Sequence, residues 1–290
     1  MRTRPFKALA MVGLTVLLGG LLAATLVRYS PGFGVDEREL DPRFNQGSIR
    51  RIREETQDRE AVLPYYLHYL ARAARGDLGV SAGFRRPVRA LIAERLPETA
   101  RSAGAGLAFG WTLGMLAAIA VVWMARPAFD LLISAAAALF LCLPSSVLGL
   151  GFVLAGRLDS RSATAAVIAL VIFPRVFRYA QALLARQSSA PHVLLARAKG
   201  VGRLGLVWSH VLLPAAPALL ALAGVSISLA FGAAIPAEVI CDSPGLGQLA
   251  WQAALKRDLP LLIDITLLVS VLTGLSGLAS EMGPPVEERS

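Results

Sequence analysis

Long runs of apolar residues alternate with polar segments along the chain, which is typical of a protein that crosses a membrane several times. A spanning helix needs about 20 apolar residues to cross about 30 Å of hydrocarbon. Six runs meet or approach this length, and they lie at Ala8–Val27, Ala103–Met124, Ala128–Ala155, Ala163–Tyr179, Val211–Ile235 and Leu261–Ala279. The pattern predicts an all-α membrane protein with six transmembrane helices.

The first apolar run, Ala8–Val27, follows three basic residues. A cleaved signal peptide has a similar layout, and Ala23 and Ala24 are small enough to precede a cleavage site. The apolar core is nevertheless longer than that of a usual signal peptide. We therefore predict an uncleaved first transmembrane helix in residues 1–27.

A large polar insert, residues 28–101, separates the first two runs. Long loops are translocated largely regardless of their charge, so we place this insert on the extracytoplasmic side. Its charged stretch Ile49–Arg75 is helix-prone, and Tyr65, Tyr66 and Tyr69 are expected to lie along the bilayer surface. A second amphipathic helix is predicted from Pro87 to Leu96, ending there because a residue before proline leaves the helical region.

The predicted membrane core, residues 102–280, contains the other five spans and is followed by a tail, residues 281–290. Gly106, Gly110 and Gly114 are spaced four residues apart, so they share one helix face that should pack against another helix. In the third span, Pro144 is expected to produce a kink, with serines after it that either line a path or satisfy freed carbonyls.

The distribution of lysine and arginine predicts the orientation of these spans. The short segments on one side carry eleven such residues and those on the other side carry four. Because basic residues accumulate in short cytoplasmic loops, both termini and the segment between the fourth and fifth spans should be cytoplasmic.

The composition agrees with this class of protein. The chain is 55% hydrophobic with a mean hydropathy of +0.59, above the roughly 45–50% apolar content of soluble domains. Its formal charge of +9 could indicate nucleic-acid binding. The basic residues lie among hydrophobic runs rather than on one soluble domain, so we expect contact with membrane lipid and none with nucleic acid.

Sequence signatures of catalysis are absent. The chain has no phosphate-binding loop of the Gly-x-x-x-x-Gly-Lys-[Ser/Thr] type, no His-Glu-x-x-His and no Gly-x-Ser-x-Gly. Two cysteines show no metal spacing, and His192 and His210 are the one histidine pair on the same predicted side. We therefore expect no enzyme activity, no cofactor and no metal site in this chain.

A polar loop between the fourth and fifth spans offers a docking site. From Pro191 it predicts a short amphipathic helix interrupted by Gly200 and Gly202, followed by a second helical start. Arg197 and Lys199 stand beside small residues, which allow close approach of another backbone and give that partner a cationic face. The alternative is an ordinary cytoplasmic loop that follows the positive-inside rule.

Two acidic residues near the predicted outer face bracket a glycine-rich turn. Ionisable groups near spans are costly and often functional, so Glu238 and Asp264 are candidates for a substrate path, with Glu238 favoured. Alternatively, both lie at helix ends where water solvates them. Glycine reaches positive φ without steric cost, so Pro244, Gly245 and Gly247 predict a compact turn that forms an outer gate or a plain hairpin.

Several strings occur in the order known from one transporter family. They are Gly76-Asp-Leu-Gly79 with Ser81, Pro87-Val88 with Leu91-Ile92, Glu94-Arg-Leu-Pro97 with Thr99, Ala196-Arg-Ala-Lys-Gly200 with His210 and Leu213-Pro214, Pro244-Gly-Leu-Gly247 after Glu238, and Arg257-Asp258 with Pro260. Together they resemble bacterial ABC-importer permeases, and most closely the dipeptide/oligopeptide/nickel branch.

The resemblance implies a fold, a location and a set of partners. The short cytoplasmic helix would fit a groove on the ATPase subunit, through residues Ala196, Arg197, Ala198, Lys199 and Gly200. The chain would pair with a second homologous permease around a shared pathway in the bacterial plasma (inner) membrane. Two ATP-binding subunits would lie inside, and an extracytoplasmic substrate-binding protein outside.

The expected function is therefore that of a permease subunit in an ATP-driven importer for peptides or a related small solute. The alternative is a stand-alone channel or secondary carrier, which would show internal repeats or intramembrane charges. Neither feature is clear in this sequence. Dipeptides, longer peptides, nickel chelates and glutathione-like molecules all fit as substrates.

Overall fold

In the computed structural model, the described residues are 4–28, 62–73, 75–124, 126–202 and 205–281. Within these ranges the structure is helical and has no strands, apart from an isolated antiparallel bridge between Val80 and Pro87. This confirms the predicted all-α class. The expectations for residues 49–61 of the insert and for the tail after Glu281 lie outside the described residues.

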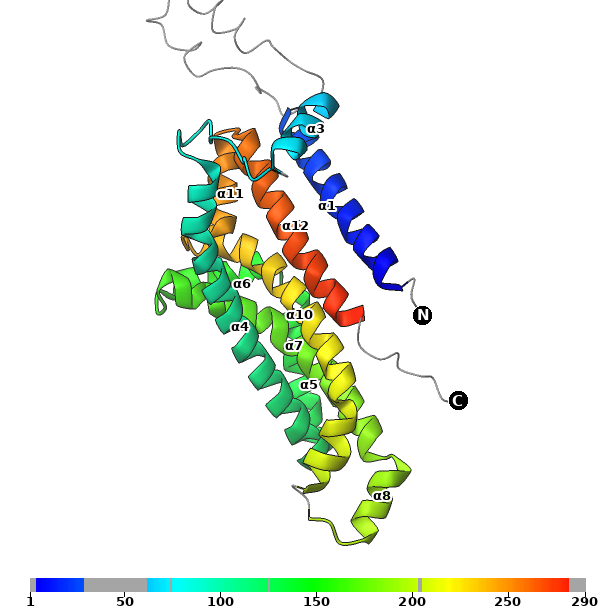
Figure 1. Cartoon of the computed structure of the whole chain (residues 1–290). Helices are drawn as coiled ribbons and strands as arrows, with labels where there is room; N and C mark the ends of the chain where they lie inside the picture. The colour runs from blue at the N-terminus through cyan, green and yellow to red at the C-terminus, as the bar shows by residue number, and fades with distance from the viewer. Residues whose placement is uncertain (1–3, 29–61, 74, 125, 203–204, 282–290) are drawn as a thin grey trace, which may run out of the picture. The chain divides into compact units, whose positions relative to one another are not determined.

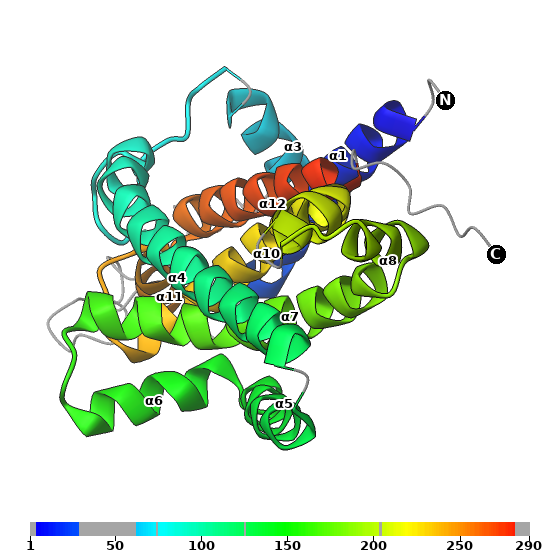
Figure 2. The ribbon, with the colours of Figure 1, turned by 90° about the horizontal axis from the view of Figure 1, so that it is seen from below.

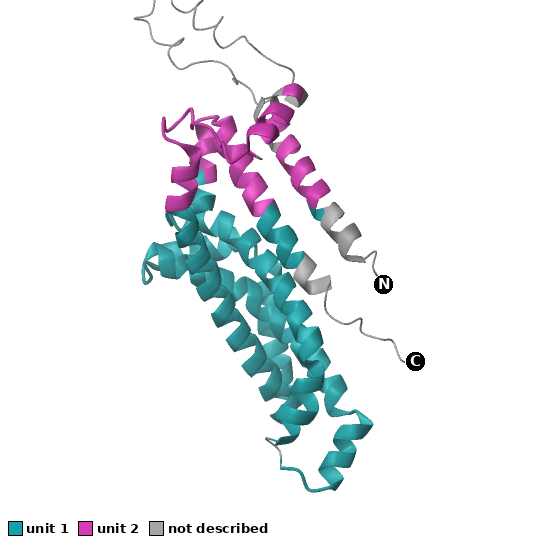
Figure 3. Cartoon of the chain, in the orientation of Figure 1, with its two compact units in different colours: residues 1–12, 95–249, 271–290 teal, residues 13–94, 250–270 magenta. Residues whose placement is uncertain are grey.

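The chain divides into two compact units (Figure 3). Unit 1 comprises Met1–Val12, Arg95–Leu249 and Val271–Ser290, and unit 2 comprises Gly13–Glu94 and Ala250–Ser270. Four of the described helices pass from one unit to the other along the chain. They are α1 (Arg4–Arg28), α4 (Val88–Met124), α11 (Leu246–Leu255) and α12 (Leu259–Glu281).

Unit 1 is a helical bundle around α7 (Ser160–Ser188), which packs against α4 and several other elements (Figures 1 and 2). The others include α5 (Pro127–Cys142), α6 (Ser145–Ala155), the π-helix η2 (Leu206–Leu212) and α10 (Leu213–Ile240). The side of α7 that faces the bundle buries Ile168, Ile172 and Phe177 completely. The same unit contains α8 (Pro191–Ala198), which packs against η2.

Unit 2 contains α3 (Val62–Ala73) and parts of α1, α4, α11 and α12. Its buried cluster is formed by Ala24, Tyr66, Tyr69, Leu259 and Ile263. The expectation that Tyr66 and Tyr69 lie along the bilayer surface is therefore wrong.

The tyrosine hydroxyls explain why these aromatic rings are inside. The Tyr66 hydroxyl donates to the Leu17 carbonyl at 2.9 Å, and the Tyr69 hydroxyl donates to the Pro260 carbonyl at 3.1 Å. A buried phenol needs such a partner, and its ring then adds apolar packing. Burial also raises the pKa of Tyr66 above its ordinary value.

Four helical segments are long and apolar enough to cross a bilayer: Val88–Met124, Ser160–Ser188, Leu206–Ile240 and Leu259–Gly277. The helices α5 and α6 add a fifth span if they are counted as one bent span. The first predicted span lies in α1, whose described apolar part, Val12–Leu26, is shorter than the others. The described residues thus support four or five spans, and six remains a prediction.

The predicted kink at Pro144 is confirmed. Helix α5 ends at Cys142, α6 begins at Ser145, and their axes differ by 100°. Pro144 is the N-cap of α6 with an extended backbone, φ −60° and ψ 145°. Proline cannot continue the hydrogen-bond ladder of the preceding helix, so the chain turns at this point.

The predicted helix end before Pro97 is wrong. Helix α4 runs without interruption through this proline, so the expected short helix and the second span are one helix of 37 residues. Polar contacts hold the next turn in place. Glu98 pairs with Arg161 at 2.6 Å, and the Thr99 hydroxyl oxygen accepts from the Leu246 N–H at 2.8 Å. Pro97 has no N–H, so one backbone hydrogen bond of α4 is missing. The contacts of Glu98 and Thr99 outweigh this loss.

The glycine face of α4 packs against α7, as predicted. A Cβ atom added at Gly106 would lie 2.6 Å from the Cβ of Ile168, and one added at Gly110 would lie 2.8 Å from the Cβ of Ile172. At Gly114 the nearest atom would be Cγ1 of Val176, at 2.8 Å. The two backbones are therefore too close for any side chain at these three positions.

Candidate functional site

Helix α8 begins and ends where the sequence indicates. Pro191 occupies the first turn after an extended Ala190, a position where the missing proline N–H costs nothing. At the other end, the Gly200 N–H donates to the Arg197 carbonyl at 3.0 Å and the Val201 N–H donates to the Ala196 carbonyl at 3.2 Å. This pair of bonds is a Schellman motif.

Gly200 closes that motif in the left-handed region, with φ 79°. A residue with a Cβ atom is strained there, so the glycine is required by the turn itself. The space beside it is open, because an added Cβ would have no atom within 4 Å. Gly200 is thus an exposed corner at the end of α8.

The predicted docking residues divide between two faces of α8. Arg197, Ala198, Lys199 and Gly200 are exposed, whereas Ala196 is 5% exposed and packs in the unit 1 core with Val193. Of the five predicted docking residues, Ala196 is therefore the one that lies against the bundle. Its small side chain lets α8 lie close to the bundle.

Two apolar residues on the exposed face of α8 were not among the predicted docking residues. Leu194 and Leu195 are 54% and 58% exposed, although this short helix is not a span. We call the exposed group Leu194, Leu195, Arg197, Lys199 and Gly200 the α8 surface. The three-residue spacing of Val193 and Ala196 puts them on one face of the helix. The sequence could therefore have indicated that Leu194 and Leu195 lie on another face.

A hydrogen bond connects α8 to the following helix. The His192 Nε2–H donates to the His210 carbonyl at 3.0 Å. The His210 ring lies against its neighbour instead, with Nδ1 2.7 Å from the Ser209 hydroxyl oxygen. The two imidazoles therefore have different partners, and no cluster of three or more metal-binding side chains occurs among the described residues.

The element that receives this bond is a π-helix. η2 spans Leu206–Leu212 and continues directly into α10, with Pro214 in the first turn of α10. π-helical turns are rare and occur frequently at functional sites. The predicted second helical start after Gly202 is confirmed, in a form that the sequence pattern did not indicate.

A second group of candidate residues lies at the other end of α10. Glu238 is completely buried, and its Oε2 accepts from the Gly247 N–H at 2.6 Å. Its Oε1 and the Ser243 hydroxyl have no hydrogen-bond partner in the described part of the chain. The alternative that water solvates Glu238 at a helix end is therefore wrong.

The glycines beside Glu238 serve close packing rather than backbone freedom. Neither Gly245 nor Gly247 has a positive φ, which corrects the reason expected for them. A Cβ at Gly245 would overlap the Glu238 carboxyl group, and one at Gly247 would lie 2.5 Å from the Ile235 carbonyl oxygen. Pro244 precedes them in the loop that leads into α11.

Thr99 of α4 contacts the same turn, because its hydroxyl oxygen accepts from the Leu246 N–H. The first turn of α11 has N–H groups without partners inside the helix. Thr99 and Glu238 provide acceptors for two of them, at Leu246 and Gly247. We call Thr99, Glu238, Gly245 and Gly247 the outer cluster.

We expect Glu238→Ala to destabilise the outer cluster, because it leaves the Gly247 N–H unpaired and removes buried packing. The cost is about 1–3 kcal/mol for an unsatisfied buried donor. Glu238→Gln keeps an acceptor oxygen and should lose less. Glu94→Ala is the control, since its exposed pair with Arg86 contributes about 0–1 kcal/mol. Thermal unfolding of the purified protein measures all three, and a wild-type midpoint for Glu238→Ala would contradict the assignment.

The other acidic candidate, Asp264, belongs to unit 2. It is 5% exposed, so the alternative of a solvated helix end is wrong for it as well.

Two of the family motifs meet in unit 2, since the Ser81 hydroxyl donates to the Asp258 carboxylate. The Gly83 N–H donates to the same carboxylate oxygen at 3.0 Å. Asp258 therefore holds the turn at residues 81–83. Ser81 and Asp258 each belong to a motif found in the sequence, but the sequence did not indicate that the two residues are in contact.

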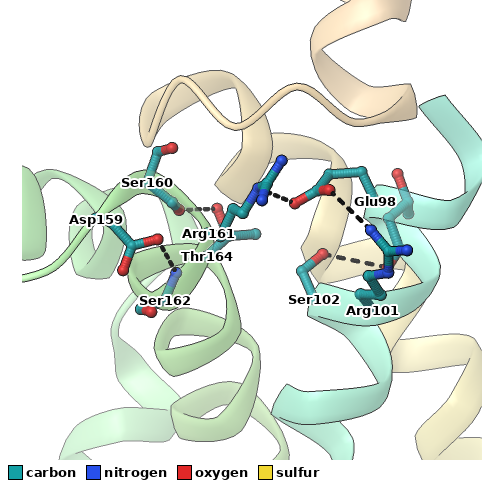
Figure 4. A network of polar contacts seen from close by, with 9 residues as sticks. Glu98, Arg101, Ser102, Asp159, Ser160, Arg161, Ser162 and Thr164 are labelled. Atoms are coloured by element: carbon teal, nitrogen blue, oxygen red, sulfur yellow. Dashed lines mark hydrogen bonds and ion pairs between the residues drawn. The ribbon is translucent and has the colours of Figure 1, made fainter. Parts of the chain in front are cut away.

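An ion-pair network in unit 1 was also missed (Figure 4). Glu98 of α4 pairs with Arg161 of α7 at 2.6 Å and lies 3.8 Å from Arg101. At the start of α7 the Asp159 carboxylate accepts from the Ser162 N–H at 3.4 Å. Hydrogen bonds from the Ser162 side chain and backbone lower the pKa of Asp159 below its ordinary value.

Comparisons with known proteins agree with these features. A putative peptide permease protein of Brucella suis biovar 1 is 27% identical over 286 residues, covering 89% of each chain. A probable peptide ABC transporter permease protein of Sinorhizobium fredii is 23% identical and covers 91% of this chain and 88% of its own. A glutathione transport system permease protein of Escherichia coli O6:H1 is 27% identical and covers 89% and 88%.

The family model described as "Binding-protein-dependent transport system inner membrane component" matches residues 110–281, which is more than half of the 290 residues. The match includes α7, α8, η2 and α10, so it covers the α8 surface and most of the outer cluster. The helical bundle, the apolar spans and this match together show that the chain belongs to the inner-membrane permease family of binding-protein-dependent ABC transport systems.

Proposed function

We propose that this chain is the permease subunit of an ATP-driven importer that takes up peptides or a related small solute. The named relatives support peptides as the substrate class, since two are described as peptide permeases and one as a glutathione permease. The observation that carries the proposal is the α8 surface, an exposed patch of mixed apolar and basic residues on a helix anchored to the bundle.

The α8 surface suits an ATP-binding subunit. Leu194 and Leu195 would be buried on docking, and apolar burial contributes about 25 cal/mol per Å². Arg197 and Lys199 lie at a solvated edge, where each ion pair contributes about 0–1 kcal/mol. The leucines would therefore supply most of the affinity, and the basic residues would orient the partner. Ala196 would act as the anchor that holds α8 against the bundle.

Force on α8 has a direct route to a membrane-spanning helix. The bond from His192 to the His210 carbonyl joins α8 to η2, and η2 continues into α10. ATP binding would bring the two ATPase subunits together and move α8. The start of α10 would follow, and the pathway shared with a second homologous permease would open alternately to the two sides.

The outer cluster lies at the opposite end of α10 and is a candidate outer gate. Glu238, Thr99 and the two glycines tie α4, α10 and α11 together in one compact turn. An extracytoplasmic substrate-binding protein would deliver solute on that side. We assign Asp264 a place on the substrate path in unit 2, supported by its burial near the start of α12.

The orientation in the bacterial inner membrane has a direct test. In a background with Cys142→Ser and Cys241→Ser, a membrane-impermeant maleimide applied to spheroplasts should label Ala82→Cys and spare Ser189→Cys. Both positions are exposed, so accessibility does not bias the result. Labelling of Ser189→Cys alone would reverse the proposed orientation, with cytoplasmic termini and an extracytoplasmic insert.

Co-purification separates an importer subunit from a stand-alone channel or secondary carrier. The full-length chain, expressed with its genomic neighbours and isolated in mild detergent, should retain an ATP-binding subunit in stoichiometric amount. Proteoliposomes containing that complex should take up peptide only when ATP and the binding protein are supplied. Uptake without ATP by the chain alone would favour the carrier and contradict the proposal.

A further inference from the structure

An open groove of about 570 Å³ lies on the surface of unit 1, between α4, α6 and the first half of α7. Its walls are apolar along most of its length. The lining residues that the argument uses are Ala105, Phe109, Leu113, Phe152, Ala166 and Leu170. Its volume falls within the roughly 300–1,000 Å³ of small-ligand sites.

The charged side chains of the groove gather at one end. Glu98, Arg101 and Arg161 line it there, and the Glu98–Arg161 and Glu98–Arg101 contacts join them (Figure 4). The Glu98 side chain is 9% exposed, whereas those of Arg101 and Arg161 are 76% and 62% exposed. Two guanidinium groups against one carboxylate leave one excess positive charge, and both arginines keep donors free toward the groove because arginine has five.

This arrangement lies on helices that cross the membrane. α4 and α7 are both long and apolar enough to span, and Phe109 and Leu113 on α4 are exposed. Glu98 and Arg101 stand near the N-terminal end of the apolar part of α4, and Arg161 stands in the first turn of α7. The charged end of the groove therefore coincides with the ends of two spans, where long basic side chains reach the headgroup region.

We infer that this groove binds an anionic phospholipid of the bilayer. Its phosphate would lie at Arg101 and Arg161, and an acyl chain would follow Phe109, Leu113 and Leu170. A molecule with one negative end and a long apolar remainder matches the excess charge and the apolar walls together. Glu98 would hold Arg161 in place, since removing its carboxylate would release the guanidinium from its 2.6 Å contact.

Photo-crosslinking in membranes locates the lipid. The full-length protein is incubated with phosphatidylglycerol that carries a diazirine in one acyl chain, irradiated and digested for mass spectrometry. Adducts should map to residues 98–113 and 158–170. Ala166→Phe fills the groove and should remove them, whereas Ala182→Phe, at an exposed position of the same helix, should not.

Native mass spectrometry of the purified chain tests the headgroup. Arg101→Gln should weaken phosphatidylglycerol binding about tenfold, which corresponds to about 1.4 kcal/mol. Arg157→Gln, an exposed arginine that does not line the groove, should bind as wild type does. Diacylglycerol with the same chains lacks the phosphate and should bind weakly, without sensitivity to Arg101→Gln.

Three results would overturn the inference. The first is that adducts map elsewhere on the chain. The second is that Arg101→Gln binds phosphatidylglycerol as tightly as wild type, or that diacylglycerol binds equally well. The third is that the adducts disappear in the assembled complex, which would show that a second permease subunit covers the groove. None of these outcomes bears on ATPase association, so the proposed function is tested separately.

Discussion

Replacing Gly200 with tryptophan should abolish both ATPase recovery and peptide uptake, while membrane insertion stays intact. The left-handed backbone at Gly200 costs a residue with a Cβ about 1–2 kcal/mol. The indole would in addition project from the exposed corner of α8 into the space that the partner needs. Insertion, pull-down of the ATP-binding subunit and uptake are measured on the same membranes.

Gly156→Trp is the matched control for this change. Gly156 also has a positive φ, 60°, also ends a helix and also has open space around it, but it lies in the loop after α6. It should carry the same backbone strain and retain ATPase recovery. Lys199→Ala should only weaken docking, because an exposed charge contributes about 0–1 kcal/mol. Wild-type recovery and uptake in Gly200→Trp would remove α8 as the docking element.

Gly110→Leu should prevent assembly of the unit 1 bundle. An added Cβ alone would lie 2.8 Å from the Cβ of Ile172 and 2.9 Å from the Ala169 carbonyl oxygen, so α4 and α7 would have to separate. Overpacking usually costs about 1–3 kcal/mol, and the fixed backbone on the α7 side places this case at the upper end. Detergent-stable complex and uptake should both fall to background.

Gly104→Leu on the same helix separates packing from helix propensity. Gly104 is exposed, and an added Cβ there would meet nothing within 4 Å. It should assemble normally, since leucine is a better helix former than glycine. If Gly110→Leu assembles and transports as Gly104→Leu does, the glycine contact between α4 and α7 is not a structural requirement.

The sequence alone predicted the features that depend on local pattern. Apolar run length located the four helices that are long and apolar enough to span, and the bent pair α5 and α6, because crossing hydrocarbon sets a minimum length. Four-residue spacing identified the glycine face of α4, and Pro144 identified the bend between α5 and α6. Pro191 and Gly200 marked the ends of α8 because the first and last turns of a helix have distinct residue preferences.

Features that depend on long-range contacts were not predicted. Helix α4 continues through Pro97 because Glu98 and Thr99 are held by residues of α7 and α11, more than 60 positions away in the chain. Tyr66 and Tyr69 are inside because carbonyls at Leu17 and Pro260 accept their hydroxyl protons. A single sequence contains no signal for such pairs.

The candidate sites show the same division. The motif at 196–200 falls at the end of α8, but which of its residues are exposed depends on how α8 is oriented against η2 and the bundle. The sequence identified Gly245 and Gly247 as turn residues, but the expected reason, a positive φ, is wrong. Their close approach to Glu238 and Ile235 becomes visible only when α10 and α11 are placed side by side.

The most direct test of the account is a crosslink from the α8 surface to the ATP-binding subunit. A photoreactive phenylalanine analogue is placed at Leu195, and for comparison at Leu154, which is 78% exposed near the end of α6. Irradiation of membranes that contain the whole transport system should join position 195, and not position 154, to the ATP-binding subunit. If position 195 gives no adduct with an ATPase that is present in the same membranes, α8 does not couple this chain to ATP.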